Sequence, residues 1–100
     1  MKLREAASVL RSKNAGPLTL TVDILFADSA IYAQAAASPR LTESTIAARY
    51  GVAADSVSLI RVAPALAIKI NLPRPIVAGS PGDHDVYGAQ QHVPLLDIEL

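Results

Sequence analysis

The sequence predicts a single α+β domain, in which an antiparallel or mixed sheet of four to five strands carries two helices on one face. Two stretches alternate apolar and polar residues, LTLTVDILF at residues 18–26 and ALAIKINL at residues 65–72. A period of two is typical of strands with one buried face. Between them lie two short segments with helix-capping signals. Neighbouring strands and grouped helices indicate an α+β rather than a parallel α/β arrangement.

The composition fits one domain spanning residues 1–100 and excludes several classes of protein. Hydrophobic residues make up 51% of the chain, and nine basic residues balance nine acidic ones, so no basic patch predicts nucleic-acid binding. No apolar run approaches the roughly 20 residues that cross a bilayer, and the charged start does not resemble a signal peptide. The lack of cysteine excludes disulfides and thiol catalysis. We therefore expect a cytoplasmic protein with no nucleic-acid and no membrane partner.

The first clear strand is residues 18–26, which Gly16 and Pro17 precede as turn residues. Its apolar face is predicted to consist of Leu18, Leu20, Val22, Ile24 and Phe26. The first thirteen residues allow either a helix or a short strand.

Two helices are predicted to follow. Asp28 is a good N-cap for a helix that runs to about Ala37, and Pro39 prevents its continuation. Thr42 caps a second helix, ESTIAARY, and Gly51 suits the left-handed position that ends many helices.

The second half of the chain predicts three further strands. Residues 57–62, VSLIRV, end at Pro64, and the strand at 65–72 ends at the PRP of residues 73–75, because proline cannot donate to a ladder. The closing stretch, PLLDIEL, alternates as well. Its inward residues are predicted to be Leu96, Ile98 and Leu100, with Leu95, Asp97 and Glu99 outward.

If the helices cover the Leu/Ile/Val face, the second face of the sheet is polar. It is predicted to carry Thr19, Thr21, Asp23, Lys69, Asn71, Asp97 and Glu99. Such a face is either solvated, as in many antiparallel sheets, or a docking surface for a partner.

The stretch GSPGDHDVYGAQQH, residues 79–92, is the main candidate for a functional segment. It belongs to a connection of about twenty residues without periodicity, and loops beyond about 12–15 residues tend to be functional or disordered. We expect an ordered binding loop rather than one that only packs. Its predicted anchors are Tyr87, Gln90 and Gln91.

This loop contains both histidines of the chain, and histidine titrates near neutral pH, where a neighbouring carboxylate can orient it. The candidate catalytic residues are Asp83, His84, Asp85 and His92. Their spacing matches no compact metal-ligand pattern, so neither a metal nor another cofactor is predicted. Two histidines in a polar loop are also compatible with a plain solvent-exposed surface.

A second polar cluster, RSKNAGP at residues 11–17, is predicted to form a turn. Cationic side chains and backbone N–H groups in a turn can hold an anion. The candidate anion-binding residues are Arg11, Ser12, Lys13 and Asn14. The cluster has no nucleotide-binding spacing, and a turn before a strand needs no function. We expect the turn and the 79–92 loop to meet in one anion-accepting site.

Four stretches, LREAASVLRSKNAGP, ALAIKINLPRP, SPGDHDVYGAQQH and PLLDIEL, resemble a small uncharacterised bacterial family, a domain of unknown function encoded beside AtuA-like (acyclic terpene utilisation) proteins. The chain is more distantly similar to the ferredoxin-like domain of those proteins, where a first strand runs into a glycine- and charge-rich turn. Ser12, Lys13 and Gly16 match that turn, whereas its acidic residues are absent. The likeness implies a ferredoxin-like fold and favours a strand at residues 2–8.

The resemblance implies a small, non-autonomous subunit of a two-protein catabolic enzyme, with an AtuA-like large protein as the other subunit. The implied ligands are small organic acids or acyl-CoA thioesters, and the implied reaction is hydration, dehydration or isomerisation. Two alternatives stay open. One is an autonomous small lyase or isomerase that uses a loop histidine, and the other is a structural homo-oligomer that uses the polar sheet face.

Overall fold

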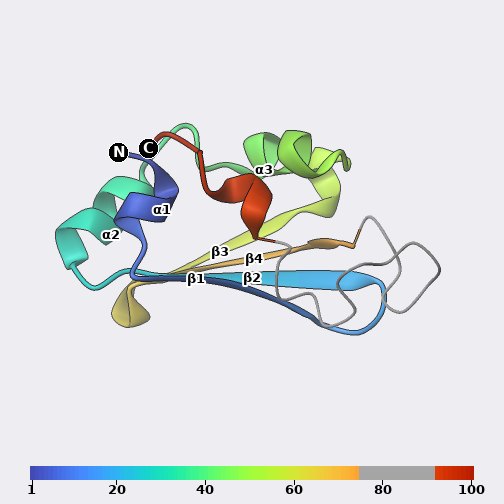
Figure 1. Ribbon diagram of the computed structural model, residues 1–100, viewed down its shortest axis with the longest axis horizontal. Helices are drawn as coiled ribbons and strands as arrows, with labels where there is room; N and C mark the ends of the chain where they lie inside the picture. The colour runs from blue at the N-terminus through green and yellow to red at the C-terminus, as the bar shows by residue number, and fades with distance from the viewer. Residues whose placement is uncertain (75–91) are drawn as a thin grey trace.

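The computed structural model describes residues 1–74 and 92–100 and shows a sheet with helices on one side (Figure 1). Within these residues, four strands form one antiparallel sheet in the order β1-β2-β4-β3. The strands are β1 (Val9–Asn14), β2 (Thr19–Leu25), β3 (Ser58–Val62) and β4 (Ala67–Pro73). The helices are α1 (Leu3–Ala6), α2 (Ser29–Ala36) and α3 (Glu43–Tyr50). This arrangement confirms the predicted α+β, ferredoxin-like class.

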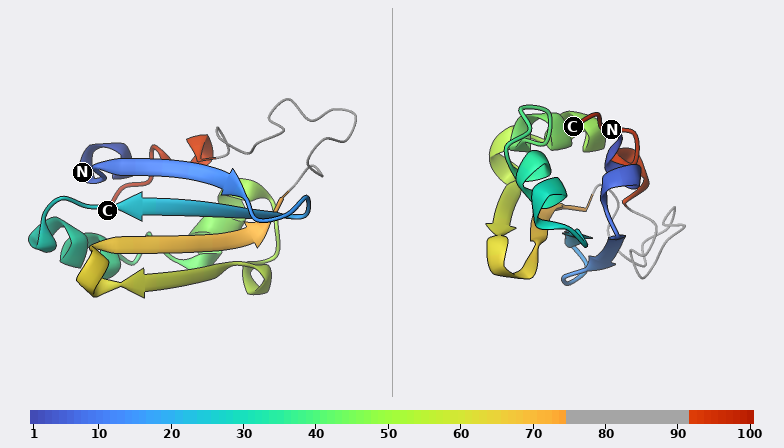
Figure 2. Two further views of the ribbon diagram at one scale, coloured as in Figure 1. Left: turned by 90° about the horizontal axis from the view of Figure 1, so that it is seen from below. Right: turned by 90° about the vertical axis from the view of Figure 1, so that its left-hand side faces the viewer.

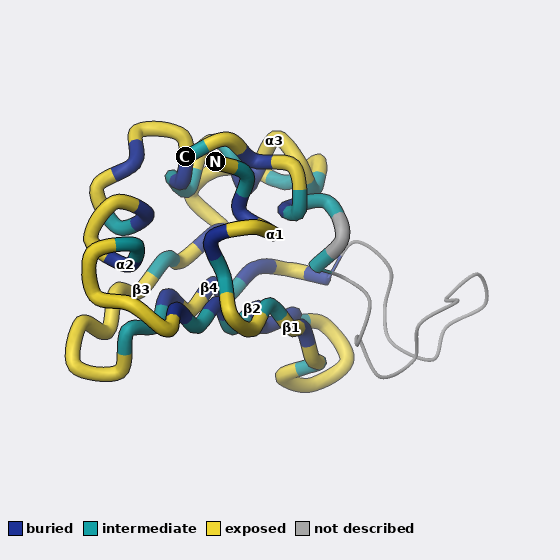
Figure 3. The backbone as a smooth tube through the Cα atoms, turned by 60° about the vertical axis from the view of Figure 1, so that its left-hand side comes forward, coloured by how far each residue is buried: buried dark blue, intermediate teal, exposed yellow. Residues whose placement is uncertain are grey.

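The core lies between the sheet and the helical layer, and the two central strands supply most of its sheet side. Along β4, burial alternates with the period of two that the sequence predicts, and β2 follows the same alternation except at Thr21, which is buried on the other face (Figure 3). The fully or almost fully buried residues of these strands are Leu20, Val22, Ile24, Ile68, Ile70 and Leu72. From the helical side, Leu3, Leu41 and Ile46 pack against them without exposure to solvent.

The predicted helix boundaries are confirmed by the capping contacts. Asp28 Oδ1 accepts a hydrogen bond from the Ala30 N–H at 2.6 Å, and Thr42 Oγ1 accepts one from the Thr45 N–H at 3.3 Å. Gly51 ends α3 with φ 69°, in the left-handed region. Among residues 1–74 and 92–100, no helix is long and apolar enough to cross a membrane.

The predicted strand at residues 2–8 is wrong, because Leu3–Ala6 is a short helix and the first strand begins at Val9. Leu3 and Ala6 are three residues apart and both buried, which is a helical spacing. The Leu3 N–H donates to the Ile98 carbonyl at 2.8 Å, which ties α1 to the C-terminus. Leu18 is exposed rather than inward, because it lies in the turn before β2.

The predicted C-terminal strand is also wrong. Residues Val93–Leu95 form a short 3-10 helix, η3, and the segment contributes one isolated bridge, Lys2 with Glu99. Leu95 and Ile98 are buried, three residues apart, whereas Leu96 is only half-buried.

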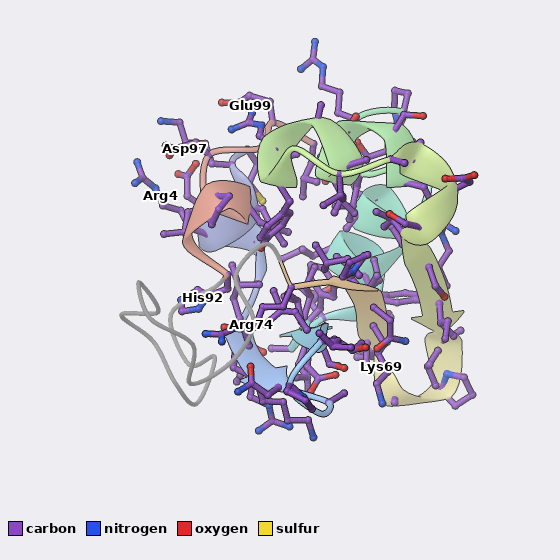
Figure 4. All side chains as sticks on the ribbon, turned by 90° about the vertical axis from the view of Figure 1, so that its right-hand side faces the viewer. Arg4, Lys69, Arg74, His92, Asp97 and Glu99 are labelled. Atoms are coloured by element: carbon purple, nitrogen blue, oxygen red, sulfur yellow. The ribbon has the colours of Figure 1, made fainter. Side chains whose placement is uncertain are left out.

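Asp97 and Glu99 therefore do not lie on the second sheet face, where the sequence placed them. Asp97 Oδ1 lies 3.4 Å from Arg4 Nη1, and Glu99 Oε2 lies 3.2 Å from the N-terminal amine. Figure 4 shows Arg4, Asp97 and Glu99 together on the helical side of the molecule.

Candidate functional site: an inner polar corner

Four polar residues interrupt the otherwise apolar inner face at the end of the sheet where β1 and β4 end. Ser12 and Asn14 lie on β1 opposite Val22 and Leu20, two buried residues of β2. The other two members are Arg74, directly after β4, and His92, directly before η3. We call Ser12, Asn14, Arg74 and His92 the inner polar corner.

Arg74 owes its position to the pairing of β4 with the chain before β2. Its backbone N–H donates to the Leu18 carbonyl at 2.9 Å, so pairing continues one residue beyond Pro73. Side chains along β4 point alternately to the two faces of the sheet, so Arg74 lies on the same inner side as Ile70 and Leu72. Only 6% of Arg74 is exposed, which is unusual for arginine, a residue type that is rarely buried unless paired.

His92 is held at the corner by a residue eighty positions away. His92 Nδ1 and Ser12 Oγ lie 3.4 Å apart, a long hydrogen bond in which the tautomer of the ring decides the donor. The ring is half-buried. Figure 4 looks onto this end of the sheet and shows His92 and Arg74 there together.

The end of α3 lies on the helical side of the same end of the sheet. α3 ends at Tyr50 and packs against η3, and its last turn lies over the end of the sheet where β4 stops (Figure 1). Burial raises the pKa of Tyr50 well above its usual value of 10.0. The hydroxyl group of Tyr50 is therefore protonated throughout the physiological range.

The prediction that Arg11–Asn14 forms an anion-binding turn is wrong in its geometry, because these residues belong to β1 and the turn spans residues 15–18. Their side chains alternate, so Ser12 and Asn14 lie on the inner face while Arg11 and Lys13 lie on the outer one. Arg11 Nε is 3.6 Å from Asp23 Oδ2, its neighbour on β2. Thus the four candidates do not form a single site.

Most of the 79–92 loop falls outside the described residues, which include none of the predicted Asp83, His84, Asp85, Tyr87, Gln90 and Gln91. His92 is the member of the loop that the structure describes. One residue of each polar segment is in contact, because Ser12 Oγ lies within hydrogen-bonding distance of His92 Nδ1.

Sequence reasoning missed Arg74, which it treated only as part of the strand-ending PRP stretch. A signal was present, because the inward positions Ile68, Ile70 and Leu72 continue with residue 74 when the alternation is extended by one step.

The corner offers a cationic fork, hydroxyl and amide groups, and one imidazole. A guanidinium can bind a carboxylate through two parallel hydrogen bonds, and an imidazole can move a proton. Ser12 lies within β1 and is 6% exposed, so it is suited to holding His92 rather than to attacking a substrate. No group of three or more His, Cys, Asp or Glu residues that could hold a metal ion occurs in the described ranges.

The chain belongs to a family described as a domain of unknown function (DUF4387), whose model matches residues 3–99. This match confirms that the chain is a member of an uncharacterised domain family. No curated protein matches the chain, and no solved structure does.

Proposed function

We propose that the chain is a small, non-autonomous subunit of a two-protein catabolic enzyme that acts on organic acids or acyl-CoA thioesters. In this proposal the inner polar corner binds the carboxylate or thioester carbonyl of the substrate. The observation that supports it most is the burial of the Arg74 side chain at the end of the sheet that also carries the contact between Ser12 and His92.

Arg74 is suited to an anion because the guanidinium presents N–H donors in a fixed planar fork that matches the geometry of a carboxylate. Hydrogen bonds between ionised groups are also stronger where water is scarce, and Arg74 is almost fully buried. We therefore assign substrate anchoring to Arg74.

His92 is the proposed proton-transfer group. Hydration, dehydration and isomerisation of organic acids and thioesters all require a proton to move at a carbon close to the carbonyl, and histidine is the side chain that most often does this. The contact with Ser12 Oγ engages Nδ1, which leaves Nε2 as the nitrogen that would act on the substrate.

The second subunit in this proposal is an AtuA-like large protein, in keeping with the family resemblance of the sequence. It would supply the remaining acid–base group and the contacts to the rest of the substrate.

The experiment is to co-express the chain with an AtuA-like large protein, and to screen organic acids and acyl-CoA thioesters by mass spectrometry and chiral separation. We expect a stable complex, with turnover that needs both proteins. Turnover by the chain alone would contradict the subunit role.

Variants of the reconstituted complex test the corner. His92→Asn keeps a nitrogen near the place of Nδ1 but cannot transfer protons, so kcat should fall by about 10²–10⁴-fold. Arg74→Lys keeps the charge but loses the fork, so KM should rise more than kcat falls. Arg40→Gln, an exposed cation between α2 and α3, is the matched control and should leave both constants unchanged. Full activity of both corner variants in an intact complex would refute the assignment.

A further inference from the structure

The second face of the sheet, which we call the outer face, is covered by no element among residues 1–74 and 92–100 (Figure 2, left). The strand register arranges its side chains in rows across the four strands. The row at the end where β2 ends is entirely apolar and consists of Val9, Leu25, Ala67 and Val62. Val9 and Val62 are 41% and 39% exposed, and Ile60 in the next row is 45% exposed.

The next two rows are polar except at Ile60 on β3. The second row contains Arg11, Asp23, Lys69 and Ile60, in the order β1, β2, β4, β3. The third row contains Lys13, Thr21, Asn71 and Ser58. Thr21 Oγ1 donates to Asn71 Oδ1 at 2.8 Å, so the central polar pair is satisfied within the chain.

We propose that the outer face is the interface of a homodimer, in which two sheets pack face to face about a twofold axis that runs parallel to the strands. Sheets that pack face to face commonly keep their strands aligned within about 30°. With this axis each row meets its own row in the partner, so the apolar row packs on the apolar row. An axis across the strands at the centre of the face would place that row against polar side chains.

The charges select the position of the axis. An axis between β2 and β4 lays β2 over β4 of the second copy, and β1 over β3. Asp23 then faces the partner's Lys69, and by symmetry the same contact forms twice. Arg11 faces the partner's Ile60, which the methylene groups of arginine can cover. With this axis no like charges oppose each other directly, and Asp23, the one anion of these rows, meets a lysine, although the rows also carry three cations, Arg11, Lys13 and Lys69.

The size of the face indicates a reversible dimer. Strands of six, seven, seven and five residues, at about 3.4 Å rise and about 4.8 Å spacing, give a projected area of about 400 Å² per copy, or about 800 Å² in total. Stable interfaces usually bury about 1,200–2,000 Å² of accessible surface. We therefore expect a dissociation constant in the micromolar range. This interface lies on the opposite face from the inner polar corner, and it does not depend on the proposed catalytic role.

Sedimentation velocity over a range of protein concentrations tests the dimer and its axis together. The wild-type chain should pass from monomer to dimer at micromolar concentration. Asp23→Lys and Lys69→Asp each create two like-charge contacts in a homodimer, so each variant alone should associate at least about tenfold more weakly. An equimolar mixture of the two variants should regain wild-type association, because each variant then offers the other an opposite charge at both contacts. Arg40→Glu, on the helical side, is the control and should associate like wild type.

A further variant separates association from folding. Ile60→Ser changes a residue that is 45% exposed on an edge strand, so it should weaken the dimer at least tenfold while the melting temperature of the monomer stays close to wild type. The proposal fails if the wild-type chain stays monomeric at the highest concentration. It fails in the same way if the face binds a different protein rather than a second copy of the chain. It also fails if the two charge variants associate like wild type, or if their mixture does not restore the dimer.

Discussion

Replacing Ile68 by alanine tests the inner face of the sheet, on which the fold and the site both depend. Ile68 is 1% exposed and lies on β4 opposite Ile24 of β2. Its neighbour Lys69 is exposed on the other face and provides the matched control, Lys69→Ala. Any stability difference between the two variants reports which face of β4 packs on the core.

The magnitude follows from the burial. Ile→Ala removes three carbon atoms, which at about 0.8 kcal/mol each gives about 2.4 kcal/mol of lost transfer free energy. The cavity adds to this, so the total loss in the free energy of unfolding should be about 3–4 kcal/mol, within the usual 2–5 kcal/mol. For a chain of 100 residues this lowers Tm by at least about 12 °C. Lys69→Ala should change the free energy of unfolding by less than about 0.5 kcal/mol.

The assay is urea denaturation followed by circular dichroism, at a protein concentration low enough to keep the chain monomeric. Ile68→Ala should lower the midpoint with an unchanged slope, which identifies a loss of stability rather than a change in the unfolded state. Equal losses for the two variants, or a larger loss for Lys69→Ala, would refute the register, because a slip by one residue exchanges the two faces.

Two further predictions concern the end of α3. Burial raises the pKa of Tyr50 above 10.0, so as pH rises the unfolded chain loses the phenol proton before the folded chain does. The stability that depends on the protonated phenol is therefore intact below about pH 10. It is lost as pH rises toward the folded-state pKa, by up to about 1.4 kcal/mol per pH unit. Tyr50→Phe should remove this part of the alkaline loss in urea titrations at pH 8 and pH 11, and an unchanged loss would contradict the assignment. Gly51→Ala should lower the free energy of unfolding by about 1 kcal/mol through backbone strain at φ 69° alone, since no atom lies within 4 Å of the added Cβ. Gly51→Asn should lower it by less. Equal melting temperatures of the wild-type chain and both variants would argue against a left-handed Gly51.

The parts of the fold that the sequence predicted are those decided by local chemistry. Apolar and polar residues alternate in the sequences of β2 and β4. The inward apolar residues of both strands, from Leu20 to Ile24 and from Ile68 to Leu72, are buried. The helix starts are set by side chains that cap their own backbone, as Asp28 and Thr42 do. Such contacts involve residues two or three positions apart, so the sequence is sufficient to place them.

The two ends of the chain were not predictable in this way because each depends on the other. Residues 94–100 contain apolar side chains that fit a period of two, but Leu95 and Ile98 fit a helical spacing equally well. The choice is made by contacts of the C-terminal segment with α1, where the Leu3 N–H bonds the Ile98 carbonyl and Lys2 pairs with Glu99. Contacts across almost the whole chain length leave no local signal.

In the candidate site, too, some features follow from the local sequence and others depend on distant contacts. The inward position of Arg74 follows from extending the alternation of β4, and the separation of Ser12 from Arg11 follows from recognising Val9–Asn14 as a strand. The contact between Ser12 and His92 joins residues eighty positions apart, and only the folded structure reveals it.

The alternation of β1 has a consequence for function that a turn at residues 11–14 would not have. It directs Ser12 and Asn14 to the inner polar corner and Arg11 and Lys13 to the outer face, so one strand serves two surfaces of different chemistry. The inner surface is suited to a small anion because it is poorly hydrated and carries a buried guanidinium. The outer one is proposed to bind a protein because its apolar row crosses all four strands, while its charges lie on β1, β2 and β4. The two surfaces share no side chain, so the proposed ligand site and the proposed dimer interface do not compete for the same residues.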